Sequence, residues 1–202
     1  MRVLCLDLEG VLIPEIWQAV ATKTGVVVLG KTTRDIPVYD DLMSMRLTAL
    51  REAQIPYQTI ADVIATVEPL PGALDFLGWA RERFQVAILS DTFYEFGMPM
   101  MRALGYPMLL CHRLHIADGF ITGYQLRQQD PKRQSVKAFQ GLGYEVLAAG
   151  DSFNDISMLE QSDAGAFLHS PDNVALAHPQ YPRCANYAEL REWLEASDFA
   201  ER

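Results

Sequence analysis

Short apolar runs alternate with longer amphipathic stretches along this chain. Runs of four or five apolar residues that end in polar or glycine-containing segments are typical of buried strands. The predicted strands are Val3–Leu6, Val86–Leu89, Met108–Cys111, Val146–Ala149 and Ala164–Leu168. Helices are predicted over Ala73–Arg83, Tyr94–Leu104, Pro131–Leu142 and Phe153–Gln161. This alternation favours an α/β fold, a doubly wound parallel sheet with helices on both faces.

Two segments interrupt the alternation. The chain between the first two predicted strands is far longer than one crossover, and it predicts helices over Pro14–Lys23, Asp40–Ala53 and Tyr57–Glu68. We therefore expect a small helical cap of residues 13–70 on a core domain of residues 1–12 and 71–202. The turn pairs within His115–Arg127 predict a hairpin. The tail Ser197–Arg202 is expected to fray.

Composition excludes several classes of protein. The 202 residues contain 17 Lys and Arg against 26 Asp and Glu, a net charge of -9, so we expect no nucleic acid among the partners. No uninterrupted apolar stretch is long enough for a membrane span, and charged residues follow Met1 too early for a signal peptide. Three widely spaced cysteines fit buried thiols in a reducing compartment. A cytoplasmic location is expected.

Acidic residues follow the predicted strands where candidate chemistry would lie. In open α/β sheets, ligands bind at the carboxyl ends of the strands. The acids expected to meet there are Asp7, Glu9, Asp151 and Asp155. They would repel one another without a cation, and their hard oxygen ligands suit Mg²⁺. Ser90 could hold phosphate oxygens, Lys132 could supply positive charge, and an Asp can form an aspartyl-phosphate.

Simpler structural roles compete with these assignments. A single Asp after a strand is more often a helix cap or a turn residue, and Asp91 fits that role. Asp130-Pro131 has the pattern of a helix start, which would leave Lys132 on the surface. The ordered combination of these residues, each at a predicted strand or helix end, favours a site over the separate explanations.

The combination resembles the four motifs of the haloacid dehalogenase-like phosphatases. Asp7-Leu8-Glu9-Gly10-Val11-Leu12 resembles the first motif, D-x-D-G-T/V-L. Ser90 resembles the second motif and Lys132 the third. Gly150-Asp151-Ser152-Phe153-Asn154-Asp155 resembles the fourth, G-D-x-x-N-D, a form that with a small helical cap points to phosphoserine phosphatases.

One departure narrows the resemblance. The second acid of the first motif is Glu9, where the family usually has Asp. Four further segments share this similarity: Pro14–Trp17, Thr33–Pro37, Leu89–Phe96 and Asp130–Val136. Together with the first motif, they make the chain similar over its full length to one branch. That branch is the bifunctional phosphoserine phosphatase/phosphoserine:homoserine phosphotransferases, which implies phosphoserine and homoserine as substrates.

The resemblance also implies roles for the matching residues. Asp7 would attack phosphorus, and Glu9 would protonate the leaving serine and then deprotonate the acceptor. Asp7, the Glu9 backbone carbonyl and Asp151 would hold Mg²⁺, with Asp155 in support. The extra methylene of Glu9 requires its carboxyl to fold back or to meet a displaced substrate.

Substrate-binding roles are implied for six further positions. Phosphate would be bound by Ser90, the Asp91 backbone N–H and Lys132, with Asn154 nearby. Glu15 and Arg46 resemble the cap residues that bind the ammonium and carboxylate of the substrate. From the residues alone, Glu15 fits the favourable start of a helix equally well, and Arg46 fits a solvated helix face. The four histidines, His112, His115, His169 and His178, show no partner pattern, and no catalytic role is assigned to them.

Two other functions share parts of this pattern. A phosphorylated signalling receiver also uses Asp, Mg²⁺, a hydroxyl residue and Lys, but it lacks a helical insert after its first strand. A phosphatase of the same fold could act on another small phosphate ester. No sequence feature decides the oligomeric state, and a homodimer is one alternative.

Overall fold

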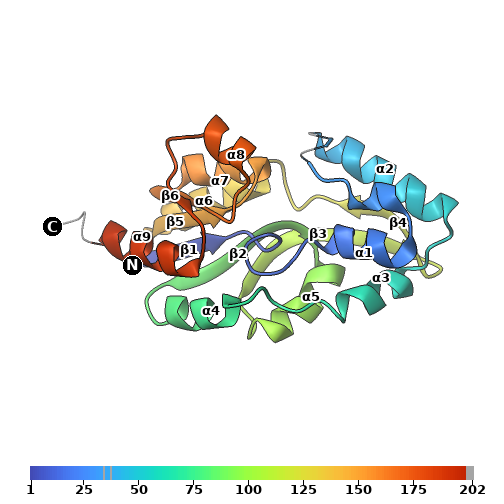
Figure 1. The fold of residues 1–202 in the computed structure, drawn as a ribbon, viewed down its shortest axis with the longest axis horizontal. Helices are drawn as coiled ribbons and strands as arrows, with labels where there is room; N and C mark the ends of the chain where they lie inside the picture. The colour runs from blue at the N-terminus through green and yellow to red at the C-terminus, as the bar shows by residue number, and fades with distance from the viewer. Residues whose placement is uncertain (34, 37, 199–202) are drawn as a thin grey trace.

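A seven-stranded sheet forms the centre of the molecule, in the order β4-β3-β2-β1-β5-β6-β7 (Figure 1). The computed structural model describes residues 1–33, 35, 36 and 38–198. All neighbouring strands pair in parallel except β3 and β4, which are antiparallel. The strands are β1 (Arg2–Leu6), β2 (Gln85–Phe93), β3 (Met108–Ala117), β4 (Phe120–Gln125), β5 (Glu145–Gly150), β6 (Ala164–Leu168) and β7 (Arg183–Cys184). The predicted α/β sheet is confirmed.

Helices cover both faces of this sheet (Figure 1). The helices that follow residue 70 are α4 (Ala73–Arg81), α5 (Tyr94–Ala103), α6 (Pro131–Gly141), α7 (Ile156–Gln161), α8 (Asp172–Ala177) and α9 (Tyr187–Asp198). A short 3-10 turn, η2 (Phe153–Asp155), precedes α7. Helices α4, α5 and α9 lie on one side of the sheet, and α6 and α7 lie on the other.

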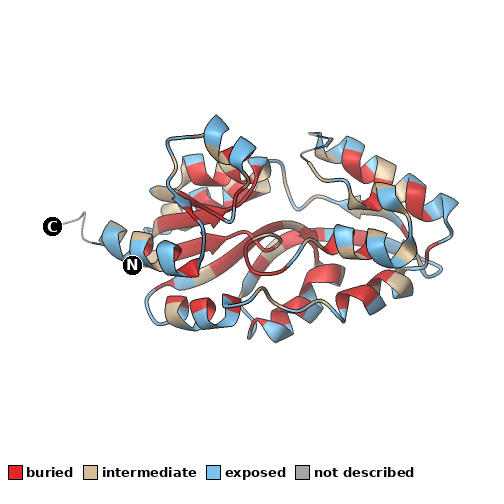
Figure 2. Ribbon diagram, in the orientation of Figure 1, coloured by how far each residue is buried: buried red, intermediate tan, exposed pale blue. Residues whose placement is uncertain are grey.

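The two-residue period of β1 divides the core between these faces. Leu4 and Leu6 belong to a large apolar cluster that includes Phe76 of α4. Val3 and Cys5 belong to a separate cluster with residues of α6 and α7. Successive side chains of a strand point to opposite faces, so a strand covered by helices on both sides must be apolar throughout. Figure 2 shows the central strands buried and the outer faces of the helices exposed.

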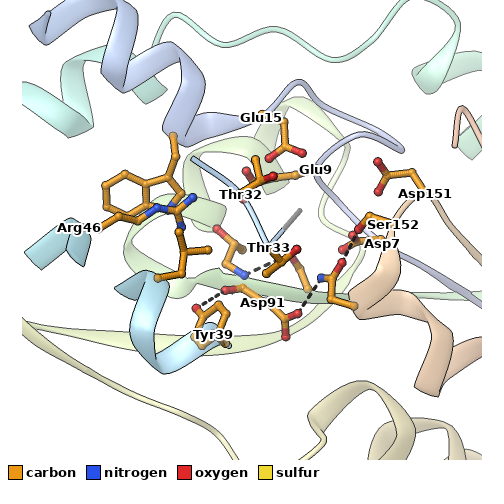
Figure 3. A pocket seen from close by; sticks show the side chains of 15 residues that line it. Asp7, Glu9, Glu15, Thr32, Thr33, Tyr39, Arg46, Asp91, Asp151 and Ser152 are labelled. Carbon is orange, nitrogen blue, oxygen red and sulfur yellow. Dashed lines mark hydrogen bonds between the residues drawn. The ribbon is translucent and has the colours of Figure 1, made fainter. Parts of the chain in front are cut away.

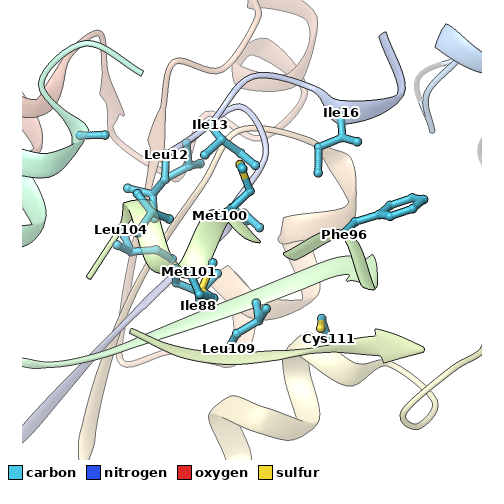
Figure 4. Packing of buried hydrophobic residues seen from close by; sticks show 14 of the residues in the cluster. Leu12, Ile13, Ile16, Ile88, Phe96, Met100, Met101, Leu104, Leu109 and Cys111 are labelled. Carbon is cyan, nitrogen blue, oxygen red and sulfur yellow. The ribbon is translucent and has the colours of Figure 1, made fainter. Parts of the chain in front are cut away.

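The segment between β1 and β2 is helical, as predicted. It contains α1 (Ile16–Thr24), η1 (Val27–Gly30), α2 (Tyr39–Glu52) and α3 (Tyr57–Ile64). Apolar residues of these helices, among them Val20, Leu50 and Ile60, belong to the same cluster as Leu4. Ile16, Phe96 and Met100 form part of this continuous packing (Figure 4). The helices between β1 and β2 are therefore packed onto the rest of the chain by shared apolar contacts.

The predicted hairpin is formed by β3 and β4. Asp118 and Gly119 at its turn both have positive φ, 52° and 82°, as a two-residue turn between twisted strands requires. The sequence predicted a separate strand to end at Cys111, but β3 runs without a break from Met108 to Ala117. Its first part pairs in parallel with β2, and its second part pairs with β4.

Other predicted boundaries were wrong. The second strand was expected to end at Leu89, but β2 continues to Phe93, so Ser90 and Asp91 lie within it. Pairing with β3 is interrupted between Leu89 and Phe93, and this irregular stretch has the polar composition of a strand end. Elements α8, β7 and α9 were not predicted. Ser197 and Asp198 of the predicted frayed tail belong to α9, and residues 199–202 lie outside the described residues.

No helix within the described part of the chain combines the length and the apolar character that a membrane crossing would need.

Candidate active site

The carboxyl ends of three adjacent strands form one pocket. Strands β2, β1 and β5 are neighbours, so the residues at their ends are brought together. Eight of the predicted site residues line this pocket: Asp7, Glu9, Glu15, Arg46, Ser90, Asp91, Asp151 and Asn154. The other two, Lys132 and Asp155, are buried, and Lys132 contacts both Asp7 and Asp155. All ten predicted residues therefore lie at a single site.

Lys132 is the positive charge beneath this site. Its Nζ lies 3.0 Å from Asp7 Oδ1 and 2.6 Å from Asp155 Oδ1. It is in the first turn of α6, and its side chain is only 3% exposed to solvent. Burial opposes its charge, but the carboxylates of Asp155 and Asp7 hold the pKa of Lys132 well above its ordinary value. The alternative of a surface lysine is wrong.

Asp155 organises the loop that follows β5. Its Oδ1 accepts a hydrogen bond from Lys132, while Oδ2 accepts from the backbone N–H groups of Asp151 and Ser152 at 2.9 and 3.0 Å. The Asp155 side chain completes a capping box with Ser152 around η2. A Cβ at Gly150 would collide with the Asp155 carboxylate, so this tight turn requires glycine. Both Asp155 oxygens are already engaged by protein donors.

Three buried carboxylates fit a divalent cation. Asp7, Asp151 and Asp155 each offer an oxygen, and these atoms lie within 4.8 Å of one another. Burial and then the charges of Asp155 and Asp151 raise the pKa of Asp7 well above its ordinary value, although Lys132 lowers it. Gly10 has a φ of 78°, and a Cβ there would lie 2.5 Å from Asp151 Oδ2, so the first-motif turn packs directly against Asp151. This hard, electron-rich oxygen set suits Mg²⁺.

Glu9 reaches from the first motif to the start of a cap helix. Its Oε2 accepts a hydrogen bond from the Ile16 backbone N–H, 2.9 Å away, at the first residue of α1. Burial and then the neighbouring Glu15 raise the pKa of Glu9 to about 7, against the opposing effects of Ile16, Arg46 and Thr92. The carboxyl therefore lies at the start of α1.

Arg46 stands on the opposite side of the pocket from Asp7 and Asp151 (Figure 3). Its Nη2 donates a hydrogen bond to the Lys31 carbonyl at 2.6 Å, and its guanidinium lies 4.6 Å from the centroid of the Trp17 ring. Burial lowers the pKa of Arg46 to about 10, which leaves the guanidinium charged at neutral pH. The alternative of a solvated face residue is wrong.

Asp91 turns its carboxylate toward the fourth motif. Asp91 Oδ2 accepts a hydrogen bond from Asn154 Nδ2 at 2.8 Å, and its backbone carbonyl accepts one from the Tyr39 hydroxyl at 2.8 Å. Burial acts against the charge, but Lys132, His112 and Asn154 together lower the pKa of Asp91 to about 2. Ser90 Oγ accepts a hydrogen bond from the Thr92 N–H at 3.2 Å. Asp91 is not the cap of α5, because Phe93 occupies that position.

Several residues of this site were not predicted from the sequence. Thr32, Thr33, Tyr39 and Thr92 line the pocket, and His112 approaches Asp91 from β3. Tyr39 begins α2, far along the chain from Asp91, so no spacing could have linked them. The available signal was that Thr33 and Thr92 lie in segments already noted for their resemblance to one branch of the family.

The chain belongs to the haloacid dehalogenase-like hydrolase family, whose model matches residues 1–163. The expected family and its enzymatic character are thereby confirmed. Phosphoserine phosphatase ThrH of Pseudomonas aeruginosa is 58% identical over 199 residues, which cover 98% of this chain and 97% of that protein. A phosphoserine phosphatase of Pseudomonas syringae pv. tomato is 56% identical over 98% of this chain and 84% of its own length. An apo crystal structure of a phosphoserine phosphatase has the same fold, with a TM-score of 0.78 at 20% identity, covering 96% of this chain and 98% of that one.

Proposed function

We propose that this enzyme is a Mg²⁺-dependent phosphoserine phosphatase that also transfers the phosphoryl group from phosphoserine to homoserine through an aspartyl-phosphate. The observation that carries the proposal is a pocket with two chemically different ends. Buried Asp7 and Lys132 lie at one end, buried Arg46 lies at the other, and Glu15 lines the same pocket beside Glu9. An amino acid phosphate ester has matching groups at its two ends. The relatives named phosphoserine phosphatase, at 58% and 56% identity, support this substrate.

In the first half-reaction, an Asp7 carboxylate oxygen attacks phosphorus. The bond from phosphorus to the serine oxygen breaks, and Glu9 gives its proton to that oxygen. A pKa of Glu9 near 7 keeps a large fraction of this carboxyl protonated at neutral pH, as a general acid needs. Lys132, 3.0 Å from Asp7, balances the charge that gathers around the transferred group.

In the second half-reaction, the acceptor hydroxyl takes the place of the departed serine. The Glu9 carboxylate removes its proton, the acceptor oxygen bonds to phosphorus, and the bond to Asp7 breaks. Water as acceptor yields inorganic phosphate, and homoserine yields phosphohomoserine. One carboxyl thus acts first as acid and then as base, which returns the enzyme to its starting state.

Mg²⁺ would be held by Asp7, Asp151 and the Glu9 carbonyl, where it would neutralise charge on the phosphoryl oxygens. Asp155 supports this set by holding the loop that carries Asp151, since its own oxygens are engaged. Ser90, the Asp91 backbone N–H and Lys132 would bind the phosphoryl oxygens, with Asn154 fixing Asp91.

The amino acid end of the substrate would lie toward the cap. Arg46 is held by Lys31 and Trp17, so its guanidinium is ordered before a carboxylate arrives. Glu15 faces the same pocket and would bind the ammonium group. Residues 13–70 would then act as a substrate-recognition cap on a catalytic core of residues 1–12 and 71–202, in a cytoplasmic enzyme.

The decisive experiment supplies phosphoserine and Mg²⁺ with and without homoserine, and follows inorganic phosphate and phosphohomoserine separately. We expect phosphate without homoserine, and phosphohomoserine at the expense of phosphate when homoserine is present. Absence of phosphoserine turnover would refute the proposal. A parallel panel of sugar and nucleotide phosphates tests the alternative substrates, and a long-lived phosphoprotein without turnover would favour a receiver.

A further inference from the structure

We propose that His112 is a positioning residue for phosphoryl transfer, acting through Asp91. The inference rests on the proposed phosphatase chemistry, but not on which phosphate ester is the natural substrate. His112 lies on β3, opposite Phe93 in the pairing with β2, and together with Asp91 it lines a second pocket beside the active-site pocket. It touches none of the reacting groups itself.

Contacts on both ring nitrogens define the state of His112. Its Nδ1 accepts a hydrogen bond from the Arg127 backbone N–H at 3.1 Å. An imidazole nitrogen that accepts cannot carry the ring proton, so in the neutral ring the proton is on Nε2. Nε2 lies 3.5 Å from Asp91 Oδ1, so the ring proton would be next to a carboxylate. The rings of Tyr39 and Phe93 pack around the imidazole, with centroids 6.0 and 6.3 Å away.

Asp91 needs a hydrogen-bond donor such as His112 because its carboxylate is next to the proposed phosphate site. It follows Ser90 directly, and its backbone N–H is proposed to face the phosphoryl oxygens. A carboxylate that turned to the same side would repel a phosphate ester. His112 at Oδ1 and Asn154 at Oδ2 give each oxygen of the carboxylate a polar partner in the protein, so the side chain does not need to turn toward a phosphate. The two contacts together keep the Asp91 carboxylate away from the phosphoryl group and hold the Asp91 backbone N–H in position to bind it.

The same histidine is connected to the helix that carries Lys132. Arg127 donates its backbone N–H to His112, and its side-chain Nη2 donates to the Pro131 carbonyl at 3.0 Å and to Ser135 Oγ at 2.6 Å. Pro131 and Ser135 flank Lys132 in the first turns of α6. His112 therefore lies between two phosphate-binding elements, the end of β2 and the start of α6.

A direct acid or base role does not fit this geometry. The His112 side chain is 1% exposed, and both ring nitrogens already face protein partners. A general acid or base must reach the substrate or an intervening water. Glu9, in contrast, lines the pocket with Asp7. Positioning through Asp91 is the role left to His112.

The test compares His112→Phe with His112→Gln, whose amide can still donate to Asp91. The assay uses p-nitrophenyl phosphate as well as phosphoserine, so failure of the proposed substrate does not prevent it. We expect His112→Phe to lower kcat about tenfold and to weaken inhibition by inorganic phosphate, with Gln recovering most of both. His115→Phe, an exposed position on the same strand, is the matched control and should match the parent enzyme.

A double-mutant cycle decides whether His112 acts through Asp91. If it does, Asp91→Ala/His112→Phe is no slower than Asp91→Ala alone. If the double variant loses activity by the product of the two single losses, His112 does not act through Asp91 and the proposal is wrong. If His112→Phe and His112→Gln lose equal activity and both have a lower melting temperature, the role of His112 is structural and the proposal is also wrong. Long-range ¹H–¹⁵N spectra of the parent enzyme should show the Nε2–H tautomer, and an Nδ1–H tautomer would contradict it.

Discussion

Glu9 accepts a hydrogen bond from the backbone N–H of Ile16, the first residue of α1, over 2.9 Å. The N-cap residue Glu15 makes no side-chain bond to this helix end, so Glu9 supplies the missing acceptor from outside the helix. The carboxylate also lies at the favourable positive end of the helix dipole. The proposed acid and base of the reaction is thus also a link between the core and the cap.

This double role makes two substitutions at Glu9 behave in opposite ways. Glu9→Gln keeps an oxygen for Ile16 but loses proton transfer, so kcat should fall by about 10²–10⁴ with unchanged stability. Glu9→Asp keeps the carboxyl but is too short for Ile16, so unfolding free energy should fall by about 1 kcal/mol while activity is largely retained. Steady-state kinetics and urea unfolding of both variants check this. Equal losses of stability in the two would contradict the helix contact.

Replacing the proposed nucleophile should end turnover without unfolding the protein. Asp7→Asn removes the attacking carboxylate, and we expect phosphate release from phosphoserine to fall at least about 10⁴-fold. Circular dichroism should show the parent secondary structure. Asp62→Asn, an exposed carboxylate of α3, is the control and should keep full activity. Retained turnover in Asp7→Asn would remove Asp7 as the nucleophile.

Metal removal should act on both activity and stability. We expect EDTA to stop turnover and Mg²⁺ to restore it. Because a ligand that binds only the folded state stabilises it, Mg²⁺ should also raise the melting temperature of the metal-free protein. Asp151→Asn should lose this rise, and Asp62→Asn should keep it. A rise of equal size in Asp151→Asn would show that Asp151 does not hold the metal.

Arg46 should matter only for substrates that carry a carboxylate. A hydrogen bond to a charged group contributes about 1.5–3 kcal/mol, so Arg46→Ala should raise KM for phosphoserine tenfold to hundredfold. KM for p-nitrophenyl phosphate, which has no carboxylate, should change little. Arg51→Ala, on an exposed position of the same helix, is the control. An equal rise in both KM values would place Arg46 at the phosphate instead.

The cysteines should resist alkylation until the protein unfolds. All three are buried, and burial raises the pKa of Cys184 to about 11 and that of Cys111 to about 12. At pH 8 the thiolate fraction is then on the order of 10⁻³ or less, and it increases only as pH approaches these values. Mass spectrometry after iodoacetamide treatment should find no label on the native protein at pH 8 and three labels after denaturation. Labelling of the native protein would contradict this burial.

Local pattern predicted much of the fold because the relevant forces act locally. Apolar runs such as Val146–Ala149 are strands, and the turn pair Asp118-Gly119 closes a hairpin. The end of β2 could not be predicted, because polar Ser90 and Asp91 lie where the pairing with β3 is interrupted, and the strand nevertheless continues to Phe93. Strand β7 was missed because it is just two residues long and depends on β6 for its hydrogen bonds. The twelve-residue helix α9 has no such reason and was not recognised in the pattern.

The sequence by itself determined the sheet, the helical insertion and the order of the acidic motifs, because periodicity and turn chemistry are properties of neighbouring residues. Only the tertiary structure decided that Lys132 is buried between Asp7 and Asp155, that Arg46 faces the pocket, and that Glu9 bonds to α1. It also gave His112 a partner that no spacing could indicate. Burial, charge pairing and hydrogen-bond direction depend on which distant segments meet, and that is settled only when the chain is folded.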